Sequence, residues 1–288
     1  MKNKKIIVTG GSGYLGQYII NELVKEYQVI SIDKKKINLK NKNYSMVRGS
    51  IKNFFKKTKI EGIYAIIHLA TAETRSSLYL NNPELALQNL SDMYFILDAI
   101  KMSKKKPILI FTSSKQIEND YKNYIKNPYS LSKEFCENLI IHYSKTHDLK
   151  AYILRISDIF SLFNNSPKKA LMVLIDRSLK NKQIKIYDSS HFFEYISVQD
   201  IVNGIQKILK IKNHKTKQIN FYGKKIEILK LVKNIRKLTK SRSKVYIKKT
   251  NSNIMEKVAI EHYKINRKWK FDSALLFIIR QMQKKLNF

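Results

Sequence analysis

The sequence predicts an α/β protein with a doubly wound parallel sheet and a smaller α/β lobe toward the C-terminus. Up to about residue 160, short apolar runs of strand length alternate with segments of helical periodicity. These runs lack the polar alternation of half-exposed strands, which indicates parallel strands buried on both faces. The alternation weakens after that point. We therefore expect a first domain at 1–160, a second lobe at 161–288, and a segment near 192–212 that returns to the first domain.

The expected elements follow in order along the chain. Apolar runs predict strands at 6–8, 29–32, 46–47, 63–68, 108–111 and 152–154. Apolar residues at the spacing of one helix face predict helices at 14–25, 83–102 and 129–142. Asn81 or Asn82 is a candidate cap for the second of these helices, because Pro83 suits a first helical turn.

The composition describes a globular chain with a very high positive charge. Apolar residues make up 43% of the 288 residues, which is enough for a hydrophobic core. A net charge of +34 would suit a nucleic acid, an anionic membrane or an anionic substrate. However, only eight of the 56 basic residues are arginine, and the lysines are spread along the whole chain. Nucleic-acid sites depend on arginine, so we interpret the charge as A/T-rich codon usage and expect no nucleic-acid partner.

The single cysteine and the hydropathy pattern bear on the cellular setting. Cys136 is the only cysteine, so no disulfide can form within the chain, which fits a reducing, cytoplasmic compartment. We expect Cys136 to be a small buried hydrophobe. The apolar run at 6–8 is too short for a secretory signal. No apolar stretch reaches the length of about 18 residues that spans a bilayer, so no integral membrane segment is expected.

A glycine-rich turn lies directly between the first expected strand and the first expected helix. Gly10, Gly13 and Gly16 have the spacing Gly-x-x-Gly-x-x-Gly. Glycine permits backbone conformations that side chains forbid, and it lets a pyrophosphate approach the backbone closely. The N–H groups and the dipole at the start of the helix then bind the phosphates. The strand before this turn and the helix after it are typical of a dinucleotide-binding domain of the Rossmann type.

Asp33 ends the second expected strand. An acidic residue at this position accepts hydrogen bonds from the adenosine ribose hydroxyls and repels a 2′-phosphate, which favours NAD over NADP. Lys34, Lys35 and Lys36 follow at once and could offset that repulsion. NAD is therefore the predicted cofactor and NADP the less favoured one. Asp33 could instead serve only as a turn or cap residue.

Tyr129 and Lys133 lie four residues apart in an expected helix and so share one of its faces. An ammonium near the phenol, together with an oxidised nicotinamide, would favour phenolate and lower the Tyr129 pKa. This spacing is common by chance in a chain with 17 tyrosines, but its place after the fifth strand gives it weight. Ser113 and Ser114 follow that strand, where parallel strands face a ligand crevice. Their hydroxyls could bind a substrate oxygen or only form local turn bonds.

Together these residues resemble the extended short-chain dehydrogenase/reductase family, in its branch of NAD-dependent nucleotide-sugar epimerases and dehydratases. Further matching segments lie at 66–71, 89–90, 112–117, 154–155, 194–200 and 218–220 and at Trp269. The resemblance implies a nucleotide-sugar substrate and a homodimer formed through the helices at 83–102 and 129–146. It implies that Ser114, Tyr129 and Lys133 are catalytic. The cofactor contacts that it implies are Gly10, Gly13, Tyr14, Leu15, Gly16, Asp33, Ser50, Ile51, Leu69, Ala70, Thr71, Asn89, Tyr129 and Lys133.

Several residues depart from the family pattern. Ser50 replaces an aspartate that normally contacts adenine, so weaker cofactor affinity is expected. Lys115 and Gln116 stand where 4,6-dehydratases carry an Asp-Glu pair, which argues against water elimination. Asp158 replaces a common asparagine near the substrate, and Phe193 replaces an arginine that often binds the substrate diphosphate. The loop before Tyr129 and the second lobe are also shorter than is usual in the family.

The resulting hypothesis is an NAD-dependent nucleotide-sugar epimerase or 4-ketoreductase. Tyr129 acts as the acid/base, Lys133 binds the nicotinamide ribose, and Ser114 binds the reacting oxygen while hydride moves between a sugar carbon and the nicotinamide. Asp33 favours an epimerase that keeps its NAD, whereas the short lobe favours a reductase. A non-catalytic dinucleotide-binding or scaffold protein and a charge-driven nucleic-acid binder remain the alternatives. His68 is expected to be structural, and no metal site is expected.

Overall fold

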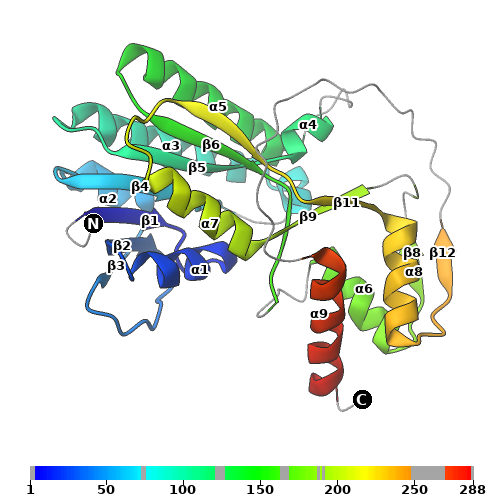
Figure 1. Ribbon diagram of the computed structural model, residues 1–288. Coiled ribbons are helices and arrows are strands. Elements are labelled where there is room, and N and C mark those ends of the chain that lie inside the picture. Colours follow the sequence, from blue (N-terminus) through cyan, green and yellow to red (C-terminus); the bar gives the residue numbers. More distant parts are fainter. Residues whose placement is uncertain are drawn as a thin grey trace. The chain divides into compact units, whose positions relative to one another are not determined.

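The computed structural model describes residues 4–72, 76–120, 127–162, 169–186, 189, 192–247 and 270–286. The chain divides into two units. The first contains Met1–Ile156 and Val202–Phe221, and the second contains Ser157–Ile201 and Tyr222–Phe288. Trp269, which matched a family segment, lies outside the described residues. Figure 1 labels most of the helices and strands of both units.

The first unit is built on a sheet whose seven described strands all pair in parallel. Their order across the sheet is β10-β6-β5-β4-β1-β2-β3. The order reverses between β1 and β4, and doubly wound sheets bind ligands at the carboxyl ends of the strands beside such a reversal. The predicted doubly wound sheet of the Rossmann type is thus confirmed. The bounds are β1 (Lys5–Thr9), β2 (Gln28–Asp33), β3 (Tyr44–Arg48), β4 (Ile63–His68), β5 (Ile108–Ser114), β6 (Ala151–Ile156) and β10 (Lys217–Phe221).

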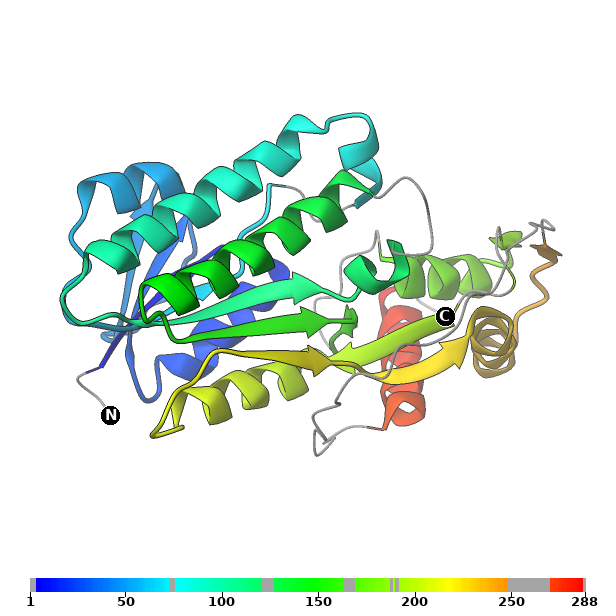
Figure 2. The ribbon, with the colours of Figure 1, turned by 90° about the horizontal axis from the view of Figure 1, so that it is seen from above.

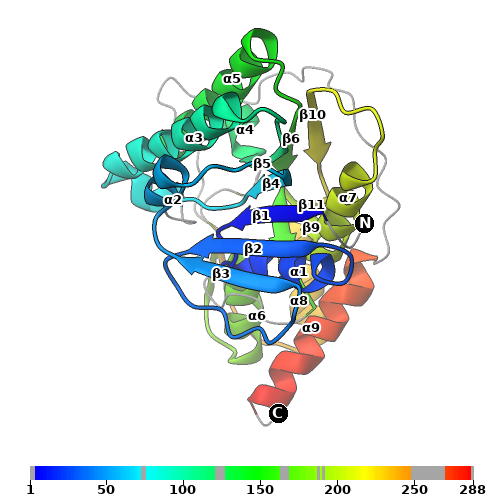
Figure 3. The ribbon, with the colours of Figure 1, turned by 90° about the vertical axis from the view of Figure 1, so that its left-hand side faces the viewer.

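Helices cover both faces of this sheet, as Figures 1 and 3 show. One face carries α1 (Tyr14–Leu23) and α7 (Val198–Leu209), whose residues from Val202 belong to the first unit. The other carries α2 (Ile51–Lys57), α3 (Glu84–Met102) and α5 (Pro128–Thr146). Figure 2 shows α3 and α5 side by side along the sheet. The short helices η1 (Ser76–Leu80) and α4 (Gln116–Asp120) follow β4 and β5, respectively.

The main core of the first unit lies between the sheet and the face formed by α2, α3 and α5. All seven residues of β5 are buried, which explains why its sequence lacks a polar alternation. Helix α3 contributes buried residues at the spacing of one helix face. The side chains in this cluster include Ile7, Ile66, Met93, Ile96, Leu97, Leu109, Phe111, Ile140 and Ile153.

The structure differs from the predicted elements mainly at their ends. Strand β5 continues through Ser114 because its last three residues still pair with β6. Helix α3 begins at Glu84 with Pro83 as its N-cap, so neither Asn81 nor Asn82 caps it. Helix α2 was not predicted from the sequence at all. Its short length leaves few positions from which a helical period can be recognised.

The second unit is an α/β lobe, as predicted. A three-stranded sheet has the order β11-β9-β7, with β9 parallel to β7 and antiparallel to β11, and β12 pairs with β8. Tyr195 of β9 stacks on Phe271 of α9, with ring centroids 4.9 Å apart, inside a core to which α6, α8 and α9 contribute. None of the helices within the described ranges is long and apolar enough to cross a membrane. The elements are β7 (Asp158–Phe160), α6 (Ala170–Leu179), β8 (Ile184–Ile186), β9 (Phe192–Ser197), β11 (Lys224–Glu227), α8 (Ile228–Thr239), β12 (Val245–Ile247) and α9 (Phe271–Lys285).

Candidate active site

The glycine turn between β1 and α1 leaves no room for side chains. Gly10 has a φ of +74°, and a Cβ atom there would lie 2.7 Å from the backbone nitrogen of Ala70. At Gly16 a Cβ would lie 2.4 Å from the carbonyl oxygen of Gly10. Gly13 serves as the N-cap of α1 and has no side chain that could compete for the N–H groups at the helix start. Tyr14 and Leu15 begin that helix, so this cradle of backbone groups fits a phosphate-bearing ligand.

Asp33 lies beside this cradle at the end of β2. One carboxylate oxygen accepts a hydrogen bond from the Ser12 N–H at 2.9 Å, and the other accepts one from the Lys35 N–H at 3.0 Å. The carboxylate therefore supports both the glycine turn and the turn that follows β2. Its position next to the turn is compatible with the predicted ribose contact.

Ser50 and Ile51 stand at the start of α2, after β3. The Ser50 hydroxyl accepts a hydrogen bond from the Asn53 N–H at 3.2 Å, so it is the N-cap of this helix. Ile51 is buried in the core. An adenine contact from Ser50 remains a prediction, and its hydroxyl already has a structural role.

Asn89 of α3 fastens the segment that follows β4. Its side-chain oxygen accepts hydrogen bonds from the Ala72 N–H at 2.8 Å and from the Thr71 hydroxyl at 3.3 Å. Its amide nitrogen donates to the Tyr79 hydroxyl at 3.1 Å and to Ser132 of α5 at 3.0 Å. Asn89 therefore fixes the strand end that carries the predicted cofactor contacts Leu69, Ala70 and Thr71.

The three predicted catalytic residues meet where β5 ends against α5. The Lys133 ammonium donates to the Thr112 carbonyl at 3.0 Å and lies 5.9 Å from the centroid of the Tyr129 ring. The Ser114 hydroxyl lies close enough to the Tyr129 phenol to act on its pKa. Tyr79, which the sequence analysis did not single out, packs edge-on against Tyr129 with centroids 5.3 Å apart.

Burial sets the protonation of these groups. It raises the pKa of Tyr129 to about 12, although the hydrogen bond from Ser114 acts in the opposite direction. Burial also lowers the pKa of Lys133 to about 8, against the effects of Cys136 and Glu137. In the protein alone, burial therefore outweighs the other effects on the Tyr129 pKa, and the lowering expected from Lys133 together with an oxidised nicotinamide stays a prediction. Tyr129 is a neutral phenol at pH 7.

His68 and Cys136 are buried next to the site. The His68 ring is hydrogen-bonded to the Thr9 hydroxyl at 2.7 Å and stacks on Phe111. Burial lowers the His68 pKa to about 3, so the ring is neutral and structural. Burial also raises the pKa of the Cys136 thiol to about 12. Among the described residues, no three His, Cys, Asp or Glu side chains form a group that could hold a metal ion.

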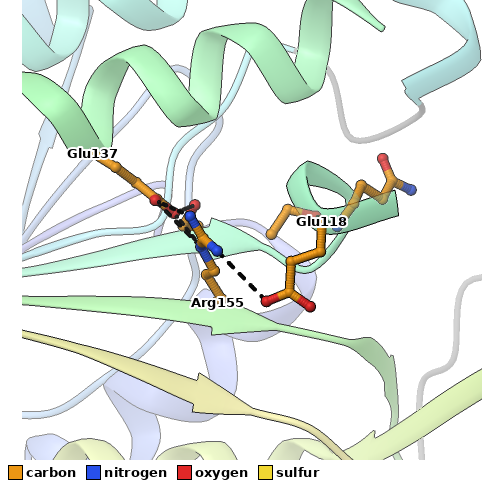
Figure 4. A network of polar contacts seen from close by, with 6 residues as sticks. Glu118, Glu137 and Arg155 are labelled. Atoms are coloured by element: carbon orange, nitrogen blue, oxygen red, sulfur yellow. Dashed lines mark hydrogen bonds and ion pairs between the residues drawn. The ribbon is translucent and has the colours of Figure 1, made fainter. Parts of the chain in front are cut away.

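A buried polar network flanks the site and was missed in the sequence (Figure 4). Arg155 of β6 binds both carboxylate oxygens of Glu137 of α5, with the shortest contact at 2.7 Å. The Ser113 hydroxyl donates to the same carboxylate at 2.5 Å. Arg155 also reaches Glu118 of α4 at 3.5 Å. The sequence offered one sign of this network: Glu137 lies four residues after Lys133, on the same helix face.

Apart from Ser50, the residues that depart from the family pattern lie at two places. Lys115 and Gln116 directly follow β5, and the Gln116 N–H donates to the Ser114 hydroxyl at 3.2 Å. Asp158 and Phe193 belong to the second unit, where Asp158 begins β7 and Phe193 stacks on Tyr195 with centroids 5.3 Å apart.

Comparison with known proteins adds the following. A model described as the NAD dependent epimerase/dehydratase family matches residues 6–221. A dTDP-D-glucose 4,6-dehydratase of Dictyostelium discoideum is 26% identical over 246 residues, which cover 72% of this chain but only 56% of that protein. The solved UDP-N-acetylglucosamine 4-epimerase from Methanobrevibacter ruminantium has a TM-score of 0.81 at 20% identity and covers 99% of this chain and 100% of that one. A UDP-glucuronic acid 4-epimerase from Bacillus cereus, solved with UDP-glucuronic acid and NAD, has a TM-score of 0.78 at 20% identity, covering 96% and 99%.

Proposed function

Because this chain belongs to the NAD-dependent epimerase/dehydratase family, we propose that it moves a hydride between a nicotinamide and a sugar carbon of a nucleotide sugar. The reaction is that of an epimerase or a 4-ketoreductase. The observation that carries this proposal is the meeting of Ser114, Tyr129 and Lys133 at the carboxyl end of β5. The Bacillus cereus epimerase, which has the same fold, was solved with both NAD and a UDP-sugar.

NAD is the proposed cofactor, and when bound it accepts and returns the hydride. The glycine turn supports this, because a Cβ at Gly10 or Gly16 would clash with the backbone of Ala70 or Gly10 and force the turn to change shape. Backbone groups at Gly13, Tyr14 and Leu15 would bind the pyrophosphate. Asp33 would bind the adenosine ribose, which favours NAD over NADP. Further contacts are proposed for Ser50, Ile51, Leu69, Ala70, Thr71 and Asn89.

Tyr129 is the proposed acid/base. Its raised pKa keeps the proton on the phenol at neutral pH, so it can donate that proton to a carbonyl oxygen. The Ser114 hydroxyl already contacts the phenol and can bind the same oxygen. The Lys133 ammonium uses one N–H on the Thr112 carbonyl, and its other two donors can bind the nicotinamide ribose. Water elimination is not proposed, because Lys115 and Gln116 supply no carboxylate beside Ser114.

Replacement of Tyr129 by phenylalanine tests the acid/base role. We expect kcat to fall about 100- to 10,000-fold, while a fluorescence titration with NADH shows that the variant still binds the cofactor. Substrates are UDP-glucose, UDP-N-acetylglucosamine, dTDP-glucose and their 4-keto forms with NADH. The control is Tyr246→Phe, since Tyr246 is exposed on β12. Unchanged turnover in Tyr129→Phe refutes the assignment, and a protein that binds no nicotinamide refutes the function.

A homodimer is proposed through α3 and α5. Leu87 and Tyr94 lie seven residues apart on α3, and Leu131 and Phe135 lie four apart on α5, so each pair shares a helix face. These four side chains are between 45% and 67% exposed, which is unusual for large apolar groups on adjacent helices. A second copy would cover them. Sedimentation should show a dimer that Phe135→Lys dissociates, and a monomeric wild type would contradict this proposal.

We also propose a role for each unit and a cellular location for the protein. The first unit would hold the cofactor, and the second would provide substrate contacts. A cytoplasmic location is supported by Cys136, which is a free, buried thiol and so suits a reducing compartment.

A further inference from the structure

The chemistry proposed above makes no use of the buried network of Ser113, Glu118, Glu137 and Arg155, which we call the Arg155 network (Figure 4). Its Arg155–Glu137 pair is almost fully enclosed, with side-chain exposures of 11% and 3%. Removing two charges from water is costly, and apolar residues of similar volume often stabilise a fold as well or better. Stability alone is therefore a weak explanation for this pair.

The Arg155 network continues a row of contacts between α5 and β5. Tyr129, Lys133 and Glu137 follow at intervals of four residues along one face of α5. Each contacts a different residue at the end of β5. Tyr129 lies near the Ser114 hydroxyl, the Lys133 ammonium donates to the Thr112 carbonyl, and the Glu137 carboxylate accepts from the Ser113 hydroxyl. Glu137 is thus the third anchor that sets the position of the helix against the strand.

Arg155 extends this anchoring to the other side of Ser114. Through Glu118 it reaches α4, which begins two residues after Ser114. The Lys115 N–H donates to the Ile156 carbonyl at 3.1 Å, so β6 also holds the link between β5 and α4. The Arg155 guanidinium therefore joins α4, which follows Ser114 in the chain, to α5, which carries Tyr129.

The charge of Glu137 also acts on Lys133. The carboxylate lies one helical turn away and favours the ammonium form, in opposition to burial. The other groups that act on this region come from several elements. They are Tyr129 and Cys136 of α5, His68 of β4, Asp92 of α3, Tyr79 of η1, Glu118 of α4 and Arg155 of β6.

We propose that Glu137 and Arg155 are positioning residues for the reaction: together they fix Ser114 and Lys133 relative to Tyr129, and Glu137 supplies a negative charge one helical turn from Lys133. This inference rests on the proposed function, because it assigns the pair a role in the same site. Neither residue contacts the reacting atoms, and both act through Ser113, Lys133 and α4.

Glu137→Gln tests the proposal, since it keeps the size of the side chain and removes its charge. We expect kcat to fall about 10- to 100-fold with little change in KM, because the reacting groups lose their alignment. The loss of negative charge lowers the Lys133 pKa below its value of about 8, so the alkaline limb of kcat/KM moves to lower pH. The control is Glu22→Gln, which removes the same charge from an exposed pair with Lys25. A wild-type kcat and pH profile in Glu137→Gln overturns the proposal.

A readout without turnover separates this proposal from the proposed function. The Lys133 side chain is followed by NMR in protein with ¹⁵N-labelled lysine, and Lys133→Met identifies its signal. We expect a lower titration midpoint in Glu137→Gln than in the wild type, and equal midpoints overturn the role of the charge. If the wild type transfers no hydride, the proposed function fails, and this titration still decides the role of Glu137.

Single variants of a buried pair can fail to fold because one charge is left without its partner. The double variant Glu137→Leu/Arg155→Met removes both charges and keeps apolar volume at both positions. We expect it to fold and bind nicotinamide but to keep a kcat about 10- to 100-fold below that of the wild type. A double variant with wild-type kcat overturns the proposal, because the pair then serves stability alone.

Discussion

The buried ring of His68 should make the first unit sensitive to mild acid. Its pKa is about 3 in the folded chain and 6.5 when unperturbed, because burial and the nearby Lys133 ammonium both disfavour the charged ring. Between these values the unfolded chain binds a proton and the folded chain does not. The contribution of His68 to stability is therefore fully present above pH 6.5 and declines as the pH falls toward 3.

The size of the effect follows from this difference. Each pH unit below 6.5 costs about 1.4 kcal/mol, so acidification from pH 7 to pH 5 removes about 2 kcal/mol of unfolding free energy. Asp92 acts in the opposite direction. Burial raises its pKa to about 6, so its carboxyl favours the folded state as the pH falls through 6. The total pH dependence thus combines both effects, and only a difference between variants isolates His68.

His68→Gln provides that difference, because glutamine does not titrate and its amide can still bond to Thr9. Unfolding free energies are measured at pH 7 and pH 5 from urea titrations and from hydrogen exchange of the β1 and β4 amides. We expect the wild type to lose about 2 kcal/mol more than His68→Gln between these two pH values. His142→Gln, a replacement of an exposed histidine on α5, should behave as the wild type does. Equal losses in the wild type and His68→Gln would refute the reasoning.

Three further predictions concern the cofactor region. Gly10→Ala should abolish NAD binding in a fluorescence titration and destabilise the chain by at least the roughly 1–2 kcal/mol that a left-handed conformation costs; retained affinity would contradict the cradle. Asp33→Asn should shift the ratio of NADP to NAD affinity toward NADP by about tenfold, measured by paired titrations, since one charged contact of about 1.4 kcal/mol is lost; an unchanged ratio would exclude the ribose contact. Asn89→Leu should cost about 3 kcal/mol in urea unfolding, because it leaves buried donors and acceptors unpaired, and a loss below about 1 kcal/mol would show that this network relaxes freely.

The sequence predicted those parts of the fold that are marked by a bounded apolar run or by an unusual residue type. The strand expected at 63–68 has the same bounds in the structure, because its apolar run begins directly after Gly62 and ends at His68. The glycine turn was predictable because its function requires an unusual residue type. Helix α2 was not, since only Ile51 and Phe55 are buried along its length and two positions do not define a period.

The site was predictable only where residues adjacent in sequence carry it. Ser114, Tyr129 and Lys133 belong to motifs, whereas Tyr79 has no motif, and its burial depends on how η1 packs against α5. Arg155 meets Glu137 only because β6 lies next to β5 in the sheet. The direction of the Tyr129 pKa also depends on tertiary structure, because local spacing shows the ammonium but not the depth of burial.

The position of β10 has a consequence for shortened forms of the protein. This strand comes late in the chain, yet it pairs along the whole of β6, whose six residues are all buried. A fragment that stops at residue 156 would contain every residue of the glycine turn and every proposed catalytic residue but would expose β6 as an unpaired edge strand. Such an edge recruits strands from other molecules. We therefore expect this fragment to aggregate during expression, whereas a chain that continues to Phe221 includes the strand that pairs with β6.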